Sequence, residues 1–193
     1  MAAKPTRVFM DITADGEPIG RLVFEVSLRV ESSLKALPIM FQLNTKVCPK
    51  TSENFRRLCT GEKGYGYKGC HWYRIVPGFC ACSGDFETQN QDRKGGHSTF
   101  DTKYFDDENY DISHDKKGIL SMDNFGWANT NSSRFFVTFT DTPWMDNFHV
   151  AFGELVEGFD VLDKMESYGI LEGAGAQKGR TSKLVVISNC GEL

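Results

Sequence analysis

The sequence predicts a mainly β protein whose strands form a closed antiparallel barrel, and three observations support this fold class. Short apolar or alternating runs recur along the chain, and turn-forming residues separate them. The chain has 19 glycines and 12% aromatic residues, a composition typical of many short strands rather than of a helical bundle. Two segments only have the spacing of an amphipathic helix. The whole chain, residues 1–193, is long enough for one domain with a sizeable core.

The chain opens with a predicted β-hairpin. Residues 7–13 alternate polar and apolar side chains, and residues 20–26 do the same. Residues 15–18, between these runs, supply the aspartate, glycine and proline of a turn. Because successive side chains of a strand point to opposite faces, each run would bury one face and expose the other.

Two segments are expected to be helical. The first, residues 51–59, follows Pro49 and stops before Gly61, which is the usual placement of these two residues at helix ends. The second, residues 159–168, has apolar side chains at helical spacing and stops at Gly169. The side chains expected to face inward are Phe55, Leu58, Cys59, Phe159, Leu162 and Met165.

The remaining apolar runs predict six further strands. They are short, rich in β-branched or aromatic residues, and bounded by turn formers. These strands cover residues 72–76, 79–83, 118–122, 135–139, 149–155 and 184–187.

Composition limits the classes of function. The formal net charge of −4 argues against nucleic-acid binding, which requires a basic face to neutralise phosphates. No apolar run is long enough to span a membrane, and the residues after Met1 lack the apolar core of a signal peptide. We therefore expect neither nucleic acid nor membrane among the partners. Six irregularly spaced cysteines favour reduced thiols and a cytoplasmic location, with a nuclear one as the alternative.

Residues 69–79 are the most informative segment. They set Arg74 among β-branched and aromatic residues, the composition of a buried strand. Arginine cannot lose its proton, so a half-buried one must face a partner, a ligand or a water-lined cleft. Residues 133–137 and 143–149 supply large apolar side chains and an imidazole, the lining of a small apolar pocket. Arg74 is therefore either a solvated or ion-paired residue on a strand edge or the cation of a binding site.

Several segments resemble the cyclophilins, and they follow one another in the family's order. They are residues 60–69, 105–109, 118–122, 129–131, 135–136, 149–153 and 189–191. Together they extend over almost the whole chain. The resemblance implies an eight-stranded barrel with a helix over each open end, peptidyl-prolyl cis–trans isomerase activity without a cofactor, cyclosporin binding and a monomeric state.

The resemblance also assigns roles to individual residues. A prolyl peptide bond rotates over a barrier of about 18–20 kcal/mol, and an enzyme lowers this barrier by binding the twisted amide more tightly than either planar isomer. In cyclophilins an arginine donates to the nitrogen of the twisted amide, and Arg74 occupies its position. Asn124 would hold the substrate backbone through its main chain, and Trp144 matches the tryptophan associated with cyclosporin. The socket for the proline ring would be formed by Phe79, Cys80, Phe136, Met145 and His149.

Some positions depart from the family pattern. They are Tyr73, Cys80, Cys82, Asp123, Phe125 and Arg134. Cys80 shortens one wall of the socket, and Cys82 replaces a glutamine that orients the arginine, a task for which a thiol is a poor substitute. Asp123 and Arg134 flank a secondary pocket in the family, so we expect them to pair across it. We expect affinity for proline peptides with weakened catalysis and weak cyclosporin binding.

Two other functions stay open. The chain could be a catalytically weak module that grips proline peptides, or that binds a partner through residues 27–46, an apolar insertion relative to the family. That insertion is expected either to fold back on the barrel or to form an exposed patch. Cys80 and Cys82 share one strand face near Arg74; they are either two inert, half-buried residues or, if the guanidinium lowers a thiol pKa, a redox sensor. Two cysteines and His149 are too few ligands for zinc, so no metal site is expected.

Overall fold

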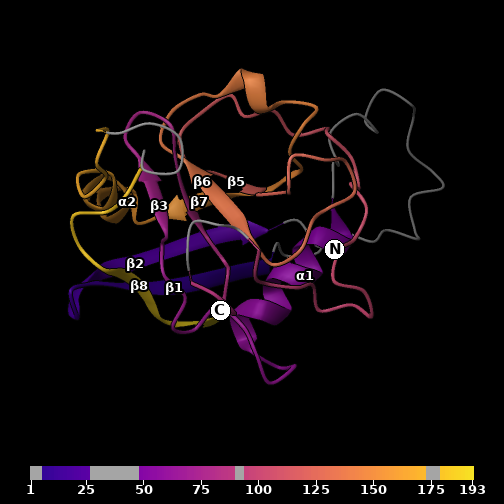
Figure 1. Cartoon of the computed structure of the whole chain (residues 1–193), viewed down its shortest axis with the longest axis horizontal. Coiled ribbons are helices and arrows are strands. Elements are labelled where there is room, and N and C mark those ends of the chain that lie inside the picture. The colour runs from indigo at the N-terminus through magenta and orange to yellow at the C-terminus, as the bar shows by residue number, and fades with distance from the viewer. Residues whose placement is uncertain (1–5, 27–47, 90–93, 173–178) are drawn as a thin grey trace, which may run out of the picture.

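Eight antiparallel strands form one curled sheet in the computed structural model, which describes residues 6–26, 48–89, 94–172 and 179–193 (Figure 1). Their order across the sheet is β3-β4-β6-β5-β7-β2-β1-β8. The strands are β1 (Thr6–Ala14), β2 (Glu17–Val26), β3 (Arg74–Val76), β4 (Cys80–Ser83), β5 (Ile119–Met122), β6 (Phe135–Thr138), β7 (Ala151–Glu157) and β8 (Val185–Glu192). Every predicted strand is present. The predicted insertion at residues 27–46 lies outside the described residues.

The prediction of a closed barrel is wrong, because β3 and β8 are the two edges of the sheet. The gap between them is bridged by the irregular segment before β3, where Trp72 N–H donates to the Val185 oxygen and Ile187 N–H donates to the Cys70 oxygen, each at 2.9 Å. Within β3, the N–H of Ile75 donates to the oxygen of Gly179, a loop residue. A strand of three residues already bonded to a loop cannot form a ladder with β8, so the sheet remains a half-barrel.

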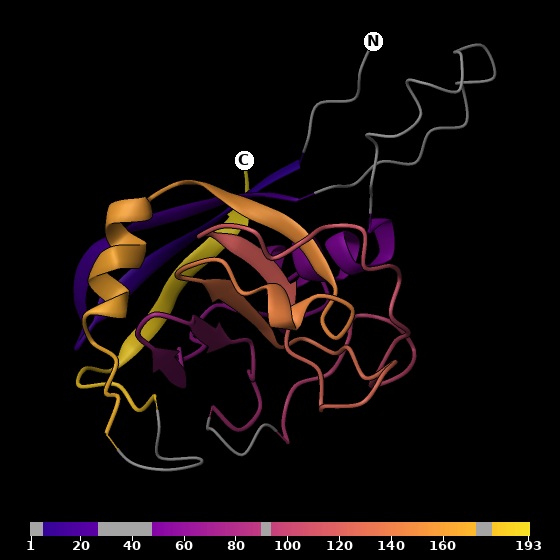
Figure 2. The ribbon, with the colours of Figure 1, turned by 90° about the horizontal axis from the view of Figure 1, so that it is seen from above.

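Two α-helices lie at opposite ends of the sheet, as Figures 1 and 2 show. Helix α1 (Pro49–Thr60) has proline in its first turn and ends at Gly61, whose φ of 67° is the left-handed conformation that glycine adopts without strain. Helix α2 (Phe159–Glu166) packs against β2. The inward-facing residues were predicted correctly except for Phe159. It is partly exposed at the first position of α2, and Val161 is buried instead.

Alternation along β4 and β6 separates two apolar clusters. Ala81, Phe135 and Val137 belong to the large core inside the curled sheet. Their neighbours Cys80, Cys82 and Phe136 point to the opposite face, where they form a second cluster with Tyr73; Phe79 and Met145 pack against it. We call this second group the outer cluster. It lies on the face of β4 and β6 opposite the main core, and five of the predicted site residues are in it or pack against it: Phe79, Cys80, Cys82, Phe136 and Met145.

Candidate functional site

Strand pairing places Arg74 on the same face of the sheet as the outer cluster, in line with two of its residues. Arg74 on β3 lies directly opposite Cys82 on β4, and Cys82 lies directly opposite Phe136 on β6. Residues opposite each other in a sheet share a face and have Cβ atoms roughly 4.5–5.5 Å apart. The half-buried guanidinium of Arg74 therefore belongs to the same face as the Phe136 ring, and one side of an apolar surface carries a permanent positive charge.

Two imidazoles fix the ring of Phe136. His149 meets it edge-on, with ring centroids 5.3 Å apart and an interplanar angle of 86°. His114 stacks on it at 5.8 Å and 17°. Nδ1 of His149 lies 2.9 Å from the main-chain oxygen of Met122, and because that oxygen can only accept, Nδ1 carries the proton. A ring held in this way gives the socket a rigid floor.

A buried hydrogen-bonded chain behind this floor was not predicted. His114 Nδ1 lies 2.8 Å from Asp146 Oδ1, and its Nε2 lies 2.9 Å from Ser121 Oγ. Burial lowers the pKa of His114, while the Asp146 carboxylate acts in the opposite direction without overcoming it. Ser121 is fully buried, so it is not accessible as a nucleophile. The residue types are those of a hydrolase triad, but His114 and Ser121 are fully buried, and the two hydrogen bonds hold the imidazole that stacks on Phe136.

The walls of the socket are apolar. Phe79 and Met145 pack against the outer cluster, and Met145 ends the short helix η2 (Pro143–Met145). Trp144, in the middle of η2, is 60% exposed and lies 6.0 Å from Phe79 between ring centroids. Trp144 is therefore an exposed aromatic side chain close to the residues that pack against the outer cluster.

The two thiols do not have the properties of a redox sensor. Cys80 and Cys82 are buried, with their sulfur atoms 3.8 Å apart. The hydrogen bond with Cys82, followed by burial, raises the pKa of Cys80 well above its usual value; the charge of Arg74 lowers it, but by less. A buried thiol with a raised pKa reacts slowly with oxidants, so the burial of both residues and the raised pKa of Cys80 favour the alternative of two inert residues.

Arg134 contacts the main chain of Asp123, and the expected charge pair between the two side chains stays a prediction. Nη2 of the fully buried Arg134 donates to the main-chain oxygen of Asp123 at 3.2 Å. The carboxylate of Asp123 accepts from the Tyr73 hydroxyl at 3.0 Å, and burial together with this carboxylate raises the pKa of Tyr73 well above its usual value. Arg134 also lies 3.7 Å from the ring centroid of Phe125. Phe125 thus covers the guanidinium, and Tyr73 connects this group to the outer cluster.

Asn124 is held by its side chain. Its Nδ2 donates to the oxygen of Phe148 at 2.7 Å, and its Oδ1 accepts from the N–H of Gly126 at 2.9 Å. These bonds fix the position of the main chain at residue 124, which is the part that the sequence assigned to the substrate.

The structure thus brings the predicted residues together in one region. Arg74, Phe79, Cys80, Cys82, Phe136 and Met145 lie at the outer cluster or in its cross-strand row, and His149 and Trp144 contact its rings. Tyr73 links Asp123, Phe125 and Arg134 to them. Sequence patterns missed His114, Ser121 and Asp146, because nothing local marks three polar residues that meet only in the folded chain.

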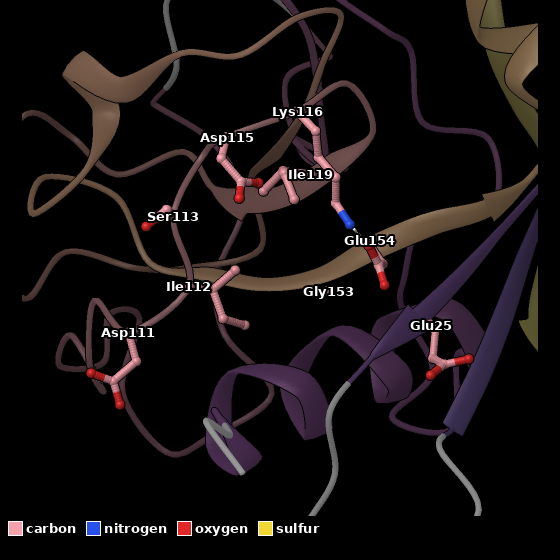
Figure 3. Close-up of a pocket in the computed structure, with 9 residues that line it drawn as sticks. All are labelled: Glu25, Asp111, Ile112, Ser113, Asp115, Lys116, Ile119, Gly153 and Glu154. Atoms are coloured by element: carbon pink, nitrogen blue, oxygen red, sulfur yellow. Dashed lines mark ion pairs between the residues drawn. The ribbon is translucent and has the colours of Figure 1, made fainter. Parts of the chain in front are cut away.

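A second hollow, of about 380 Å³, is lined by none of the predicted residues (Figure 3). Glu25, Asp111, Asp115 and Glu154 give it an acidic lining, and the ammonium group of Lys116 is paired with Glu154. Across the described residues, no group of three or more His, Cys, Asp or Glu side chains is arranged to hold a metal ion. The helices of the described ranges include none that is long and apolar enough to cross a bilayer.

Residues 26–192 match the family model for the cyclophilin type peptidyl-prolyl cis-trans isomerase/CLD. The matched range begins at the last residue of β2 and includes every residue of the outer cluster.

Proposed function

The chain belongs to the cyclophilin-type peptidyl-prolyl cis–trans isomerases and is an enzyme of that class, and from this premise we propose that it isomerises X-Pro bonds of peptides and proteins with Arg74 as the catalytic residue. The observation that carries the proposal is the cross-strand row of Arg74, Cys82 and Phe136. It joins one permanent cation to an apolar socket, and these are the two groups that prolyl isomerisation requires.

Arg74 acts on the nitrogen of the twisted amide. When the C–N bond rotates out of plane, this nitrogen becomes pyramidal and basic, so it accepts a hydrogen bond that the planar amide cannot accept. A guanidinium offers its donors in a rigid fork and keeps its charge at any physiological pH. Preferential binding of the twisted state by about 7 kcal/mol would accelerate the reaction by a factor of roughly 10⁵.

The socket holds the proline ring while the rest of the peptide turns. The ring rests on Phe136 between Phe79, Met145 and His149, all of which contact the outer cluster or its rings. The main chain at Asn124 binds the substrate backbone in the manner of an added strand. Because side-chain bonds already fix this segment, little conformational entropy is lost when the substrate binds.

We expect this enzyme to keep its affinity for proline peptides but to catalyse their isomerisation weakly. Cys82 lies opposite Arg74, and its thiol is a weak hydrogen-bonding group that packs against Cys80 instead. Arg74 is therefore less firmly oriented than it would be beside an amide side chain. Phe125 and Arg134 occupy the edge of the site near Asp123, which supports weak cyclosporin binding.

The alternative function is a binding module that grips proline peptides with little turnover. The buried thiol pair beside Arg74 is the observation that favours it. A partner bound by residues 27–46 would be a further form of this function, but that segment lies outside the described residues. The free thiols at all six cysteines support cytoplasmic or nuclear substrates.

Exchange NMR on a short Ala-Pro peptide tests the proposal. The protein should produce cis–trans exchange cross-peaks that Arg74→Ala abolishes and Arg74→Lys greatly weakens, because lysine keeps the charge but loses the fork. The matched control is Arg21→Ala on β2, whose guanidinium pairs with Asp11 in another part of the sheet. Peptide shifts without exchange would identify the binding module. Exchange that persists in Arg74→Ala would remove Arg74 from the catalytic role.

A further inference from the structure

Three exposed aromatic side chains gather on one hollow beside the site. Trp127, Trp144 and Phe148 expose 73%, 60% and 68% of their surface, and all three line a hollow of about 290 Å³. Among the described residues, four other large apolar side chains are exposed, and none of them lines this hollow. Single exposed apolar residues are normal, whereas several around one hollow mark a binding surface. We call this group the aromatic hollow.

Hydrogen bonds fix the main chain on both sides of the aromatic hollow. Asn124 Nδ2 donates to the Phe148 oxygen at 2.7 Å and so ties the loop that carries Trp127 to the segment after η2. Within that loop, Thr130 Oγ1 donates to the Trp127 oxygen at 2.6 Å and accepts from the Phe125 N–H at 3.0 Å. Aromatic side chains have few rotatable bonds, so rings on a fixed main chain lose little entropy when they bind.

The aromatic hollow shares two residues with the proposed proline socket. Met145 and His149 line the hollow, and both also contact the socket: Met145 packs against the outer cluster, and His149 lies edge-on to Phe136. A peptide with its proline ring on Phe136 therefore carries its neighbouring residues past these two side chains. The occupant of the hollow that these shared residues indicate is part of the same peptide.

The lining determines the chemistry of that occupant. The residues that line the aromatic hollow include no aspartate, glutamate, lysine or arginine. A charged side chain would give up water there without gaining a counter-ion, whereas an apolar one gains contacts with three rings.

We propose that the aromatic hollow is a specificity subsite that binds a large apolar or aromatic side chain of the substrate next to its proline. The proposal rests on the isomerase function proposed above and names the substrate class: X-Pro segments that are flanked by a bulky apolar residue. Trp127 and Phe148 are the residues that select this side chain, while Arg74 acts on the bond itself.

Dissociation constants from NMR titration of a peptide series test the subsite. The parent peptide has one proline among alanines, and phenylalanine then replaces alanine at each of the two positions before and after the proline. One of these peptides should bind about fivefold more tightly than the parent, the gain expected for one good aromatic contact. In the double variant Trp127→Ala/Phe148→Ala, the ratio of the two dissociation constants, parent peptide over phenylalanine peptide, should be close to 1. The control Leu184→Ala, which truncates an exposed apolar residue outside the hollow, should retain the advantage of the phenylalanine peptide.

The outcomes separate this proposal from the isomerase function. No advantage of phenylalanine at any position, or an advantage that survives the double variant, would overturn the subsite. A lysine peptide that binds better than the phenylalanine peptide would overturn it too, since the rings would then be holding a cation. Exchange of the parent peptide in the wild type reports on isomerisation separately, so its absence alongside a ring-dependent binding advantage would overturn the enzyme proposal alone.

Discussion

Arg134 is a buried cation that holds the edge of the site together. Its guanidinium donates to the Asp123 oxygen and lies under the Phe125 ring, which in turn meets Tyr104 at 5.2 Å. The sequence predicted that Asp123 and Arg134 are close, because both match one pocket of the family. It did not predict that Tyr73 binds the carboxylate, because these two residues are 50 positions apart and meet only in the folded chain.

Phe125→Ala should lower the free energy of unfolding by about 1–2 kcal/mol. The change removes the cation–π contact with a guanidinium that has little access to water, the setting in which such contacts are strongest. Urea denaturation measures the effect. Phe148→Ala is the control, because its mostly exposed ring should cost less than about 0.5 kcal/mol. Equal losses in the two variants would contradict a stabilising role for the Phe125–Arg134 stack.

His114 should make the protein less stable in mild acid. Burial holds the pKa of His114 below the ordinary value of 6.5. Between the lowered pKa and pH 6.5, the imidazole is therefore mostly protonated in the unfolded chain and mostly neutral in the folded one. The stability from the neutral imidazole is complete above pH 6.5 and is lost as the pH falls through the lowered pKa. Its slope is at most about 1.4 kcal/mol per pH unit.

Unfolding free energies between pH 7.5 and about pH 5 would reveal this contribution, since they should fall less steeply in His114→Gln than in the wild type. Parallel curves for the wild type and His114→Gln would assign the acid sensitivity to other groups.

Helix α1 depends on a residue far from it in the chain. Its N-cap, Cys48, makes no side-chain capping bond, and its first turn holds no acidic residue. Glu108 supplies both functions: its carboxylate accepts from the main-chain N–H groups of Lys50 and Thr51 and from the Thr51 hydroxyl, each at 3.0 Å. A negative charge at this position also interacts favourably with the helix dipole.

Glu108→Ala should therefore destabilise the protein by about 1–2 kcal/mol, the usual cost of a lost cap. Glu108→Gln keeps one oxygen as acceptor and should lose less. Thermal and urea unfolding of both variants, with Glu17→Ala at the exposed first position of β2 as control, would test this order. If glutamine were as damaging as alanine, the carboxylate charge rather than the hydrogen bonds would be the main contribution.

The elements were largely predictable because alternation and helix-end residues are local signals. Helix α1 begins at Pro49 and ends before Gly61, as these residues indicate. The error at β3 has a different origin. Its sequence from Trp72 to Val76 predicts one strand, yet only Arg74–Val76 forms β3. The residues before Arg74 form hydrogen bonds with β8 instead, and the N–H of Ile75 donates to the oxygen of Gly179. Such competition between distant segments leaves no pattern in a single sequence.

The molecule as a whole depends on its first hairpin. β2 pairs with β7, and β1 pairs with β8, so these two strands join the sheet around the site to its far edge. Their inward side chains, among them Val8, Met10 and Phe24, are fully buried in the main core.

A fragment that begins at Val26 should be unfolded. It would lack the partners of β7 and β8 and would expose the apolar surface that the hairpin covers, at a cost of roughly 25 cal/mol per Å². Circular dichroism and amide NMR dispersion measure the result, and addition of a peptide of residues 6–26 should partly restore structure. A cooperative thermal transition in the fragment alone would show that the remaining strands suffice.

The alternation along β4 and β6 assigns the stability of the fold and the binding of substrate to different residues. Ala81, Phe135 and Val137 maintain the interior, while Cys80, Cys82 and Phe136 between them belong to the face outside. A directed-evolution library restricted to the outward set would therefore vary substrate preference and leave the residues of the main core unchanged. This protein is accordingly a suitable scaffold on which new peptide specificities can be selected, one alternate residue at a time.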